Sequence, residues 1–208
     1  MITLAIDTST PQGSVAVLQD GAVIVNDQFM ADRSHSASLF ITLERVLAAY
    51  PKIDQIAIGL GPGSYAGIRI SIAAALGLQL AHQAALVGLP SVAALPVHSK
   101  EYMAIGDARR ETFYFTLVQN GICSDGPRLM TEEELRNALG QFPHLPVCAS
   151  TALPGFADAQ IVQPSAAILG RLAAAGAAIT ARGDLEPIYL REPHITRPKP
   201  RVVPGSPS

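Results

Sequence analysis

The sequence has few cysteines, few charged residues and little net charge. Its 208 residues include two cysteines, Cys123 and Cys148, which do not form a Cys-x-x-Cys pair. This excludes a disulfide scaffold and a cysteine-based zinc site, and it fits a reducing compartment. Charged residues make up 15% of the chain and the formal net charge is −2, which argues against a strongly basic nucleic-acid-binding protein. The 49% of hydrophobic residues excludes disorder as the main state.

No apolar stretch is long enough to span a membrane. The most apolar stretches, residues 66–81 and 166–181, each contain an arginine. A spanning helix needs about 20 apolar residues, so both stretches predict buried helices of a soluble protein. The first residues carry no basic cluster and reach an acid at Asp7, unlike a signal peptide. We therefore expect a cytoplasmic protein without a membrane segment.

The histidines do not form a recognisable metal site. No two of them stand four residues apart, the spacing that places two ligands on one helix face. They are His35, His82, His98, His144 and His194. We expect no bound metal, and the spacing supports no Ser-His-Asp arrangement.

The two halves of the sequence repeat the same order of features. In each half an apolar strand ends at an acid, and a hairpin signal follows fourteen positions later: Asp7 precedes Gly21, and Asp107 precedes Gly121. Each hairpin is followed by a helix and a further buried strand. Because parallel strands need helical crossovers, this order predicts a duplicated α/β fold with two lobes and a cleft between them.

We expect three parts along the chain. Residues 1–98 form the N-terminal lobe, residues 99–191 a smaller, reduced C-terminal lobe, and residues 192–208 a proline-rich basic tail. The long helices that begin near Ser64 and Ser165 are expected to be equivalent in the two lobes. The prolines exclude a helix in the tail. We favour a solvated extension, and a basic arm that reaches RNA phosphate or an acidic partner stays open.

The helix predicted over residues 66–81 has two apolar faces. One stripe carries large side chains: Ile68, Ile72, Leu76 and Leu80. The other stripe carries mostly small ones: Ile70, Ala73, Ala74, Gly77 and Ala81. A surface helix needs one apolar face, so this helix is either buried between two layers or packs closely against another protein.

The helix predicted over residues 36–50 supports the second interpretation. It carries the large side chain of Phe40 outside its main apolar stripe. We expect the two helices to form a partner interface together. Its residues are Leu39, Phe40, Leu43, Val46, Ile70, Ala73, Ala74, Gly77 and Ala81.

A turn of polar residues, Asp7, Thr8 and Ser9, follows the first strand. An acid with hydroxyls at this place is typical of a metal–phosphate site, and the alternative is a turn that satisfies its own backbone. The equivalent turn in the second half carries Arg109 and Arg110, where a phosphate would need bare backbone. We interpret the first turn as a vestigial nucleotide or phosphate loop. Weak nucleotide binding stays open.

The glycine-rich segment 61–67 predicts a helix start rather than a catalytic loop. It has no Lys-Ser/Thr pair after its glycines, so it is not a P-loop. Ser64 is the expected helix cap.

Five segments resemble the TsaB (YeaZ) family in order and spacing. They are residues 6–10, 33–36, 61–70, 107–110 and 187–191. The resemblance implies a duplicated actin-like, Hsp70-like (ribonuclease H-like) ATPase fold. It also implies an accessory and dimerization subunit of the bacterial machinery that makes threonylcarbamoyladenosine at tRNA position 37. The implied partners are the TsaD-type catalytic paralogue and a TsaE-type ATPase. A homodimer is expected when the chain is alone, with tRNA met through the complex.

The resemblance further implies that the chain is not an enzyme by itself. The paralogue carries a metal-binding His-x-x-x-His, and this sequence has Ser91 and Leu95 at the corresponding places. No cofactor is expected, although weak or interface-bound ATP or ADP stays open. Three alternatives remain: a small ATP-dependent phosphotransferase of the same fold, a metallopeptidase related to the paralogue, and a self-associating structural protein.

Overall fold

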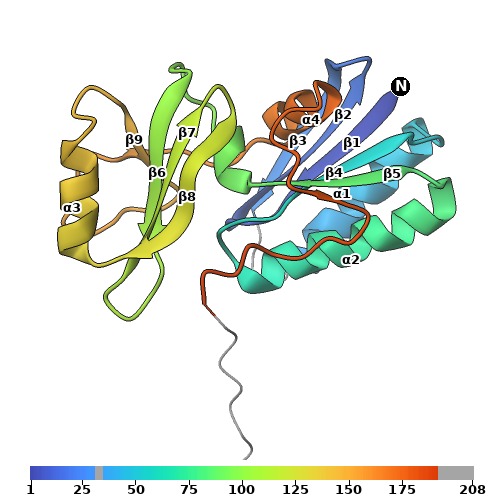
Figure 1. Ribbon diagram of the computed structural model, residues 1–208. Helices are drawn as coiled ribbons and strands as arrows, with labels where there is room; N and C mark the ends of the chain where they lie inside the picture. Colours follow the sequence, from blue (N-terminus) through green and yellow to red (C-terminus); the bar gives the residue numbers. More distant parts are fainter. Residues whose placement is uncertain (31–34, 192–208) are drawn as a thin grey trace, which may run out of the picture.

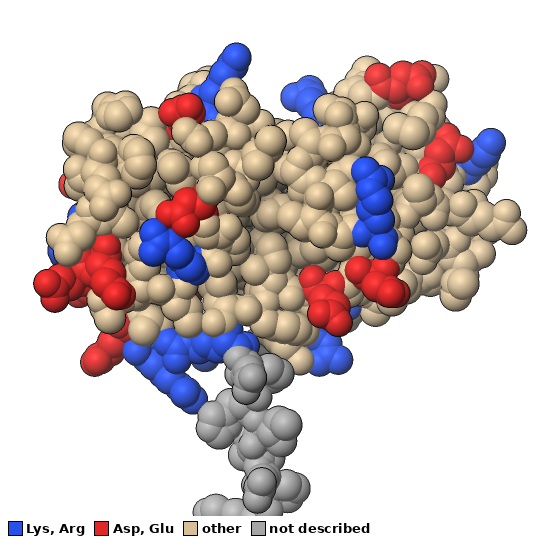
Figure 2. Space-filling model, viewed as in Figure 1, with Lys and Arg blue, Asp and Glu red and all other residues tan. Residues whose placement is uncertain are grey.

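Two β-sheets lie side by side in the computed structural model, and each has helices against it (Figure 1). The structure describes residues 1–30 and 35–191. Arg33, Ser34 and the expected tail at residues 192–208 lie outside the described residues. Uncharged side chains cover most of the visible surface, and Lys and Arg side chains gather along its lower edge (Figure 2).

The first sheet has six strands in the order β11-β5-β4-β1-β2-β3. They are β1 (Ile2–Asp7), β2 (Gln12–Gln19), β3 (Ala22–Met30), β4 (Gln55–Gly59), β5 (Ala85–Leu89) and β11 (Ala181–Arg182). Strand β1 pairs antiparallel with β2 and parallel with β4. The predicted hairpin turn joins β2 to β3, with Asp20 and Gly21 both at positive φ.

The second sheet repeats this arrangement in the order β10-β9-β6-β7-β8. Its strands are β6 (Glu101–Asp107), β7 (Phe113–Gln119), β8 (Ile122–Met130), β9 (Val147–Ala149) and β10 (Gln160–Ile161). Strand β6 pairs antiparallel with β7 and parallel with β9, as β1 does with β2 and β4. The predicted duplicated α/β fold is confirmed.

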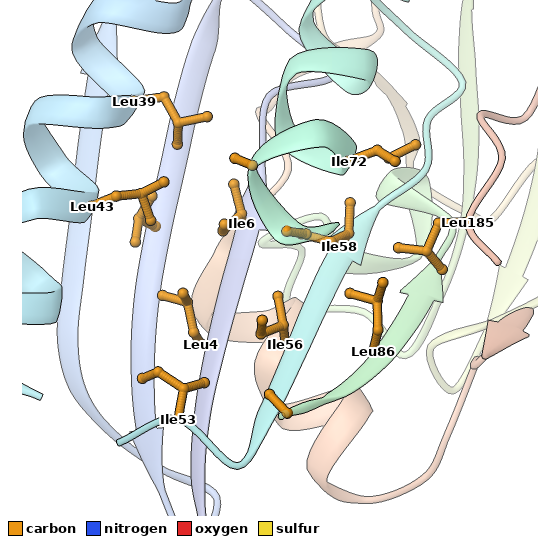
Figure 3. Close-up of a cluster of buried hydrophobic side chains, with 14 of the residues drawn as sticks. Leu4, Ile6, Leu39, Leu43, Ile53, Ile56, Ile58, Ile72, Leu86 and Leu185 are labelled. Carbon is orange, nitrogen blue, oxygen red and sulfur yellow. The ribbon is translucent and has the colours of Figure 1, made fainter. Parts of the chain in front are cut away.

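Helices α1 (His35–Ala49) and α2 (Tyr65–His82) cover one face of the first sheet. Leu39, Leu43 and Ile72 of these helices meet Leu4 and Ile58 of the sheet in a buried cluster (Figure 3). The burial of one such side chain stabilises the fold by about 1.5–3 kcal/mol. This core fixes both helices on the sheet.

The last helix, α4 (Ala166–Ala174), lies against the first sheet, where it contacts β1 and β2. Ser165 caps α4, and the Ser14 hydroxyl of β2 accepts a hydrogen bond of 2.9 Å from the Ala166 N–H. The expectation that α4 is the second-lobe equivalent of α2 is therefore wrong. The segment between β9 and β10 holds the place equivalent to α2, and it contains no helix.

Each lobe contacts a helix that comes from the other lobe's part of the sequence. Besides α4, strand β11 also joins the first sheet, although both fall within residues 99–191. The short 3₁₀ helix η1 (Ser91–Ala94) follows β5 of the first sheet and contacts β7 and β8 of the second. The second sheet has its own helix in α3 (Glu132–Gly140), which opens with the predicted capping box of Thr131 and Glu134.

Residues 1–30 and 35–191 contain no helix that is both long and apolar enough to cross a membrane.

The close contact between α4 and the first sheet depends on Gly170, because glycine has no side chain to separate them. A Cβ atom there would lie 2.2 Å from Leu18 Cδ1 and 3.2 Å from Ala5 Cβ, both in a fully buried cluster. We expect Gly170→Val to lower the free energy of unfolding by about 1–3 kcal/mol, because the buried side chains cannot move aside. Urea unfolding measures this difference.

The matched control is Gly140→Val at the end of α3, where a Cβ atom would meet nothing within 4 Å. It should change stability by less than about 0.5 kcal/mol. Equal losses in the two variants would contradict the close packing of α4.

Candidate docking surface and inter-lobe cleft

Helices α1 and α2 enclose an apolar groove on the outer side of the first lobe. Its volume is about 470 Å³. The lining residues are Phe40, Leu43, Glu44, Leu47, Ala73, Ala74, Gly77 and Leu78. A Cβ atom at Gly77 would meet nothing within 4 Å, so the groove is open above this residue.

The exposed face of α2 extends the groove along the helix. Leu76 is 42% exposed and Leu80 is 84% exposed, and Phe40 of α1 is 53% exposed. Ala73 and Ala81 of the same helix are also exposed. The result is a contiguous apolar surface with small residues at its centre, which allows a partner helix to approach closely. We call the α1–α2 groove with this face the docking surface.

The structure divides the nine residues that were expected to form the partner interface. Phe40, Ala73, Gly77 and Ala81 are exposed, and Ile70 is partly exposed. Leu43 and Ala74 are buried and form the floor of the groove. Leu39 and Val46 are buried in the core beneath α1, because this helix needs them to pack on the sheet.

Sequence analysis missed Leu76 and Leu80, which it placed on one stripe with the buried Ile68 and Ile72. The reason is the helical pitch. Residues four positions apart advance by about 40°, so a stripe from Ile68 to Leu80 turns by about 120° around the helix. Its second half therefore leaves the sheet and faces outward.

The carboxyl group of Asp7 is enclosed at the end of β1. Its Oδ1 accepts hydrogen bonds from the N–H of Ser9 at 2.9 Å and from the Ser9 hydroxyl at 2.7 Å. Its Oδ2 has no hydrogen-bond partner of standard geometry, although the Ser91 hydroxyl lies close to it. Burial raises the pKa of Asp7, and the hydroxyls of Ser91 and Ser9 oppose this shift.

The polar groups of the turn after Asp7 are used within the chain. The Thr8 hydroxyl donates a hydrogen bond of 2.8 Å to the Gly67 carbonyl, and the Ser64 N–H donates one of 2.6 Å to the Ser9 carbonyl. A Cβ atom at Gly63 would lie 2.1 Å from the Ser9 oxygen. The turn is thus packed against the start of α2. Its geometry is that of the alternative named in the sequence analysis, a turn whose polar groups form hydrogen bonds within the chain.

A second cavity, of about 480 Å³, lies between the lobes where sequence analysis expected a cleft. Its walls come from the start of α2, the β6–β7 loop, the residues after β9, and the segment 187–191. They include Ser64, Tyr65, Asp107, Arg109, Tyr114, Ser150, Thr151, Tyr189 and Arg191. Residues 7–9 do not line this cavity.

The segment 187–191 connects the two lobes along the cleft. The Ile188 N–H donates a hydrogen bond of 2.8 Å to the Leu60 carbonyl of the first lobe. The Arg191 guanidinium donates hydrogen bonds to the Arg109 carbonyl and the Thr112 hydroxyl of the second lobe. This segment therefore makes hydrogen bonds to both lobes along the cleft.

Two tyrosines that sequence analysis did not select meet at the mouth of the cleft. The ring centroids of Tyr65 and Tyr189 are 5.5 Å apart. The Arg69 guanidinium lies 5.1 Å from the centroid of the Tyr65 ring and donates a hydrogen bond of 2.7 Å to its hydroxyl. Their only signal in the sequence was their place in two segments that carry the family resemblance.

Within the described part of the chain, no three His, Cys, Asp or Glu side chains come together in a group that could hold a metal ion. Ser91 and Leu95, at the places of the paralogue's histidines, are both buried beside the junction of the lobes.

We expect Asp7→Asn to stabilise the protein near pH 7 by about 1–3 kcal/mol, because it removes a buried charge and keeps the Oδ1 acceptor. Since the folded state raises the pKa of Asp7, it binds the proton more tightly than the unfolded state does. The free energy of unfolding of the unaltered protein therefore falls as pH rises above the ordinary pKa of an aspartate.

Thermal unfolding of both proteins at about pH 4 and about pH 7 measures this effect, and the advantage of the variant should grow with pH. Asp158→Asn, at an exposed position, controls for the general loss of one negative charge. An advantage that is the same at both pH values would contradict the raised pKa.

Comparison with known proteins supports the resemblance seen in the sequence. The family model described as TsaD, tRNA N6-adenosine threonylcarbamoyltransferase, matches residues 28–122. The Haemophilus influenzae protein named tRNA threonylcarbamoyladenosine biosynthesis protein TsaB is 29% identical over 67% of this chain and 58% of its own length. The Escherichia coli protein of the same name is 33% identical over 44% of this chain and 41% of its own length. The chain thus matches less than two thirds of either relative.

A solved structure shares the fold over almost the whole chain. It is a Pseudomonas aeruginosa protein described as uncharacterized, with similarity to peptidase YEAZ. It superposes with a TM-score of 0.70 at 24% identity and covers 91% of this chain and 99% of that chain. The duplicated topology, the matching segments and these relatives agree in one respect: the chain is similar to proteins of the TsaB (YeaZ) family.

Proposed function

We propose that this protein is a non-catalytic subunit in tRNA threonylcarbamoyladenosine biosynthesis, and that it binds and activates a TsaD-type threonylcarbamoyltransferase. The observation that carries the proposal is the docking surface, an open apolar surface on α1 and α2. Single exposed apolar residues are common, but a contiguous apolar patch marks an interaction site. The names of the TsaB relatives supply the pathway.

The part of the chain that matches the TsaD family model supports a TsaD-type partner for this surface. The matched residues 28–122 include both α1 and α2, so a TsaD-type protein has related helices of its own. Two related chains can pair through equivalent surfaces about an approximate twofold axis, as identical subunits do. The small residues Ala73 and Gly77 leave room for two such helix pairs to pack closely.

The interior of the first lobe supports a non-catalytic role. The polar groups of Thr8 and Ser9 bond within the chain, and the Asp7 carboxyl lies away from the inter-lobe cavity. A phosphotransferase would need these groups to face its nucleotide, so the geometry disfavours that alternative. A TsaE-type ATPase and the tRNA would then associate with the complex of this chain and its TsaD-type partner.

Self-association is the second candidate, and the same docking surface favours it. Without its partner, a surface that exposes Leu76, Leu80 and Phe40 can be covered by a second copy. The homodimer and the heterodimer would then compete for the same two helices.

We expect Gly77→Arg to weaken pairing with TsaD from the same organism by at least about thirtyfold, the equivalent of about 2 kcal/mol. The arginine would place a charge and a long side chain at the centre of an apolar contact. It should leave the fold intact, because nothing lies within 4 Å of a Cβ atom at this position. Size exclusion with light scattering measures the complex, and circular dichroism checks the fold.

The control variant is Gly140→Arg, which introduces the same side chain at the open end of α3. It should pair like the unaltered protein. A one-to-one complex that survives Gly77→Arg would place the interface elsewhere and sink the proposal, as would the absence of any complex with the unaltered chain.

A further inference from the structure

The mouth of the inter-lobe cleft carries arginines that have no acidic partner. Among the described residues, no carboxylate lies within 4 Å of the guanidinium of Arg69, Arg109 or Arg110, or of Arg191 at the cavity wall. Other arginines of the protein do form such pairs, namely Arg45, Arg128 and Arg136. Figure 2 shows Lys and Arg side chains along the lower edge of the molecule, on the side where the β6–β7 loop and the start of α2 lie in Figure 1.

The acidic residues near the cleft mouth are fewer than its arginines. Asp107, Glu111 and Glu186 lie in or next to the segments that line the cleft, beside the four arginines. The Asp107 carboxylate is turned back on its own loop, where it accepts a hydrogen bond of 2.6 Å from the Arg109 N–H. The chain as a whole has a net charge of −2, so the positive charge at the cleft mouth is local.

An aromatic pair lies in the same place. Tyr65 from α2 and Tyr189 from the segment 187–191 are each 45% exposed, and their rings are 5.5 Å apart and inclined at 36°. Each ring therefore presents part of its surface to solvent beside the arginines. Unpaired bases of RNA stack on such rings, while arginines hold the flanking phosphates.

We propose that the cleft mouth binds single-stranded RNA, with one unpaired base against Tyr65 and Tyr189 and adjacent phosphates on Arg69, Arg109 and Arg110. The inference rests on the proposed function for its partner, since a tRNA loop is then the RNA that the complex presents. It adds a direct RNA contact by this chain, where the proposed function needs only a protein contact.

The extent of the charged surface favours RNA over a free nucleotide. Arg69 and Arg110 lie outside the lining of the cavity, so the charged surface is not confined to the residues that a small ligand in the cavity would touch. The place beside β1 where a nucleotide phosphate would bind is closed by the contact between Ser64 and Ser9. A strand that crosses the mouth would use all three phosphate-binding arginines at once.

The test uses the full chain and a fluorescent RNA hairpin with an anticodon-type loop, with binding followed by anisotropy over a range of salt concentrations. We expect Tyr189→Ala to weaken binding about tenfold, through the loss of stacking. The double variant Arg109→Glu with Arg110→Glu should abolish binding at moderate salt. The matched control is Arg171→Glu with Arg182→Glu, which reverses two exposed arginines outside the cavity lining and should bind like the unaltered chain.

Several outcomes would overturn the RNA site. They are no binding by the unaltered chain, equal losses in the cleft and control double variants, equal affinity for the hairpin and for a blunt RNA duplex, and equal affinity for the hairpin and for adenosine monophosphate. Each would show that the exposed rings and the arginines do not act together on a single strand.

Light scattering of the same variants with TsaD separates this inference from the proposed function. The cleft residues lie outside the α1–α2 groove, so pairing should be unchanged when RNA binding is lost. Unchanged RNA binding with unchanged pairing in the cleft variants overturns the RNA site and leaves the proposed function standing. Loss of pairing in the cleft variants would show that the mouth is part of the protein interface, and it overturns the RNA site as well.

Discussion

The hydrogen bond from the Ser64 N–H to the Ser9 carbonyl determines how the first lobe is arranged. It joins the start of α2 to the turn after β1, and Gly63 makes room for the contact because it has no Cβ atom. Together with the buried core beneath α1 and α2, this contact fixes the position of α2, which supplies one wall of the cleft and one wall of the docking surface.

The same contact explains why the polar groups after β1 do not face the inter-lobe cavity. The acid and the hydroxyls are still at the end of β1, but they bond to Ser9 and to Gly67 instead of facing a ligand. A buried carboxyl with one oxygen unsatisfied costs stability. Gly59 makes room for this carboxyl, because a Cβ atom at that position would lie 1.8 Å from Asp7 Oδ2. The chain therefore has the acid and the hydroxyls at the end of β1, but packing encloses them.

The sequence predicted features that depend on neighbouring residues. The hairpin turns, the capping box at Thr131 and the limits of α2 all follow local rules, and matched spacings revealed the duplication. It failed where distant segments meet. No local sequence pattern predicts that α4 packs on the first sheet. None predicts the contact between Tyr189 and Tyr65, which are more than a hundred residues apart. The outward direction of Leu80 could have been predicted from the helical pitch alone, because residues taken four apart drift around the helix axis.

The position of α2 gives the two surfaces a common rigid element and keeps them apart. Tyr65 and Arg69 belong to its first turns at the cleft, whereas Gly77 and Leu80 belong to its last turns at the docking surface. A helix rises about 1.5 Å per residue, so the midpoints of these two residue pairs are roughly 17 Å apart along its axis. The proposed protein contact and the proposed RNA contact therefore use different residues of α2. Two separate contacts that share one helix can act together on a substrate without competing for the same residues.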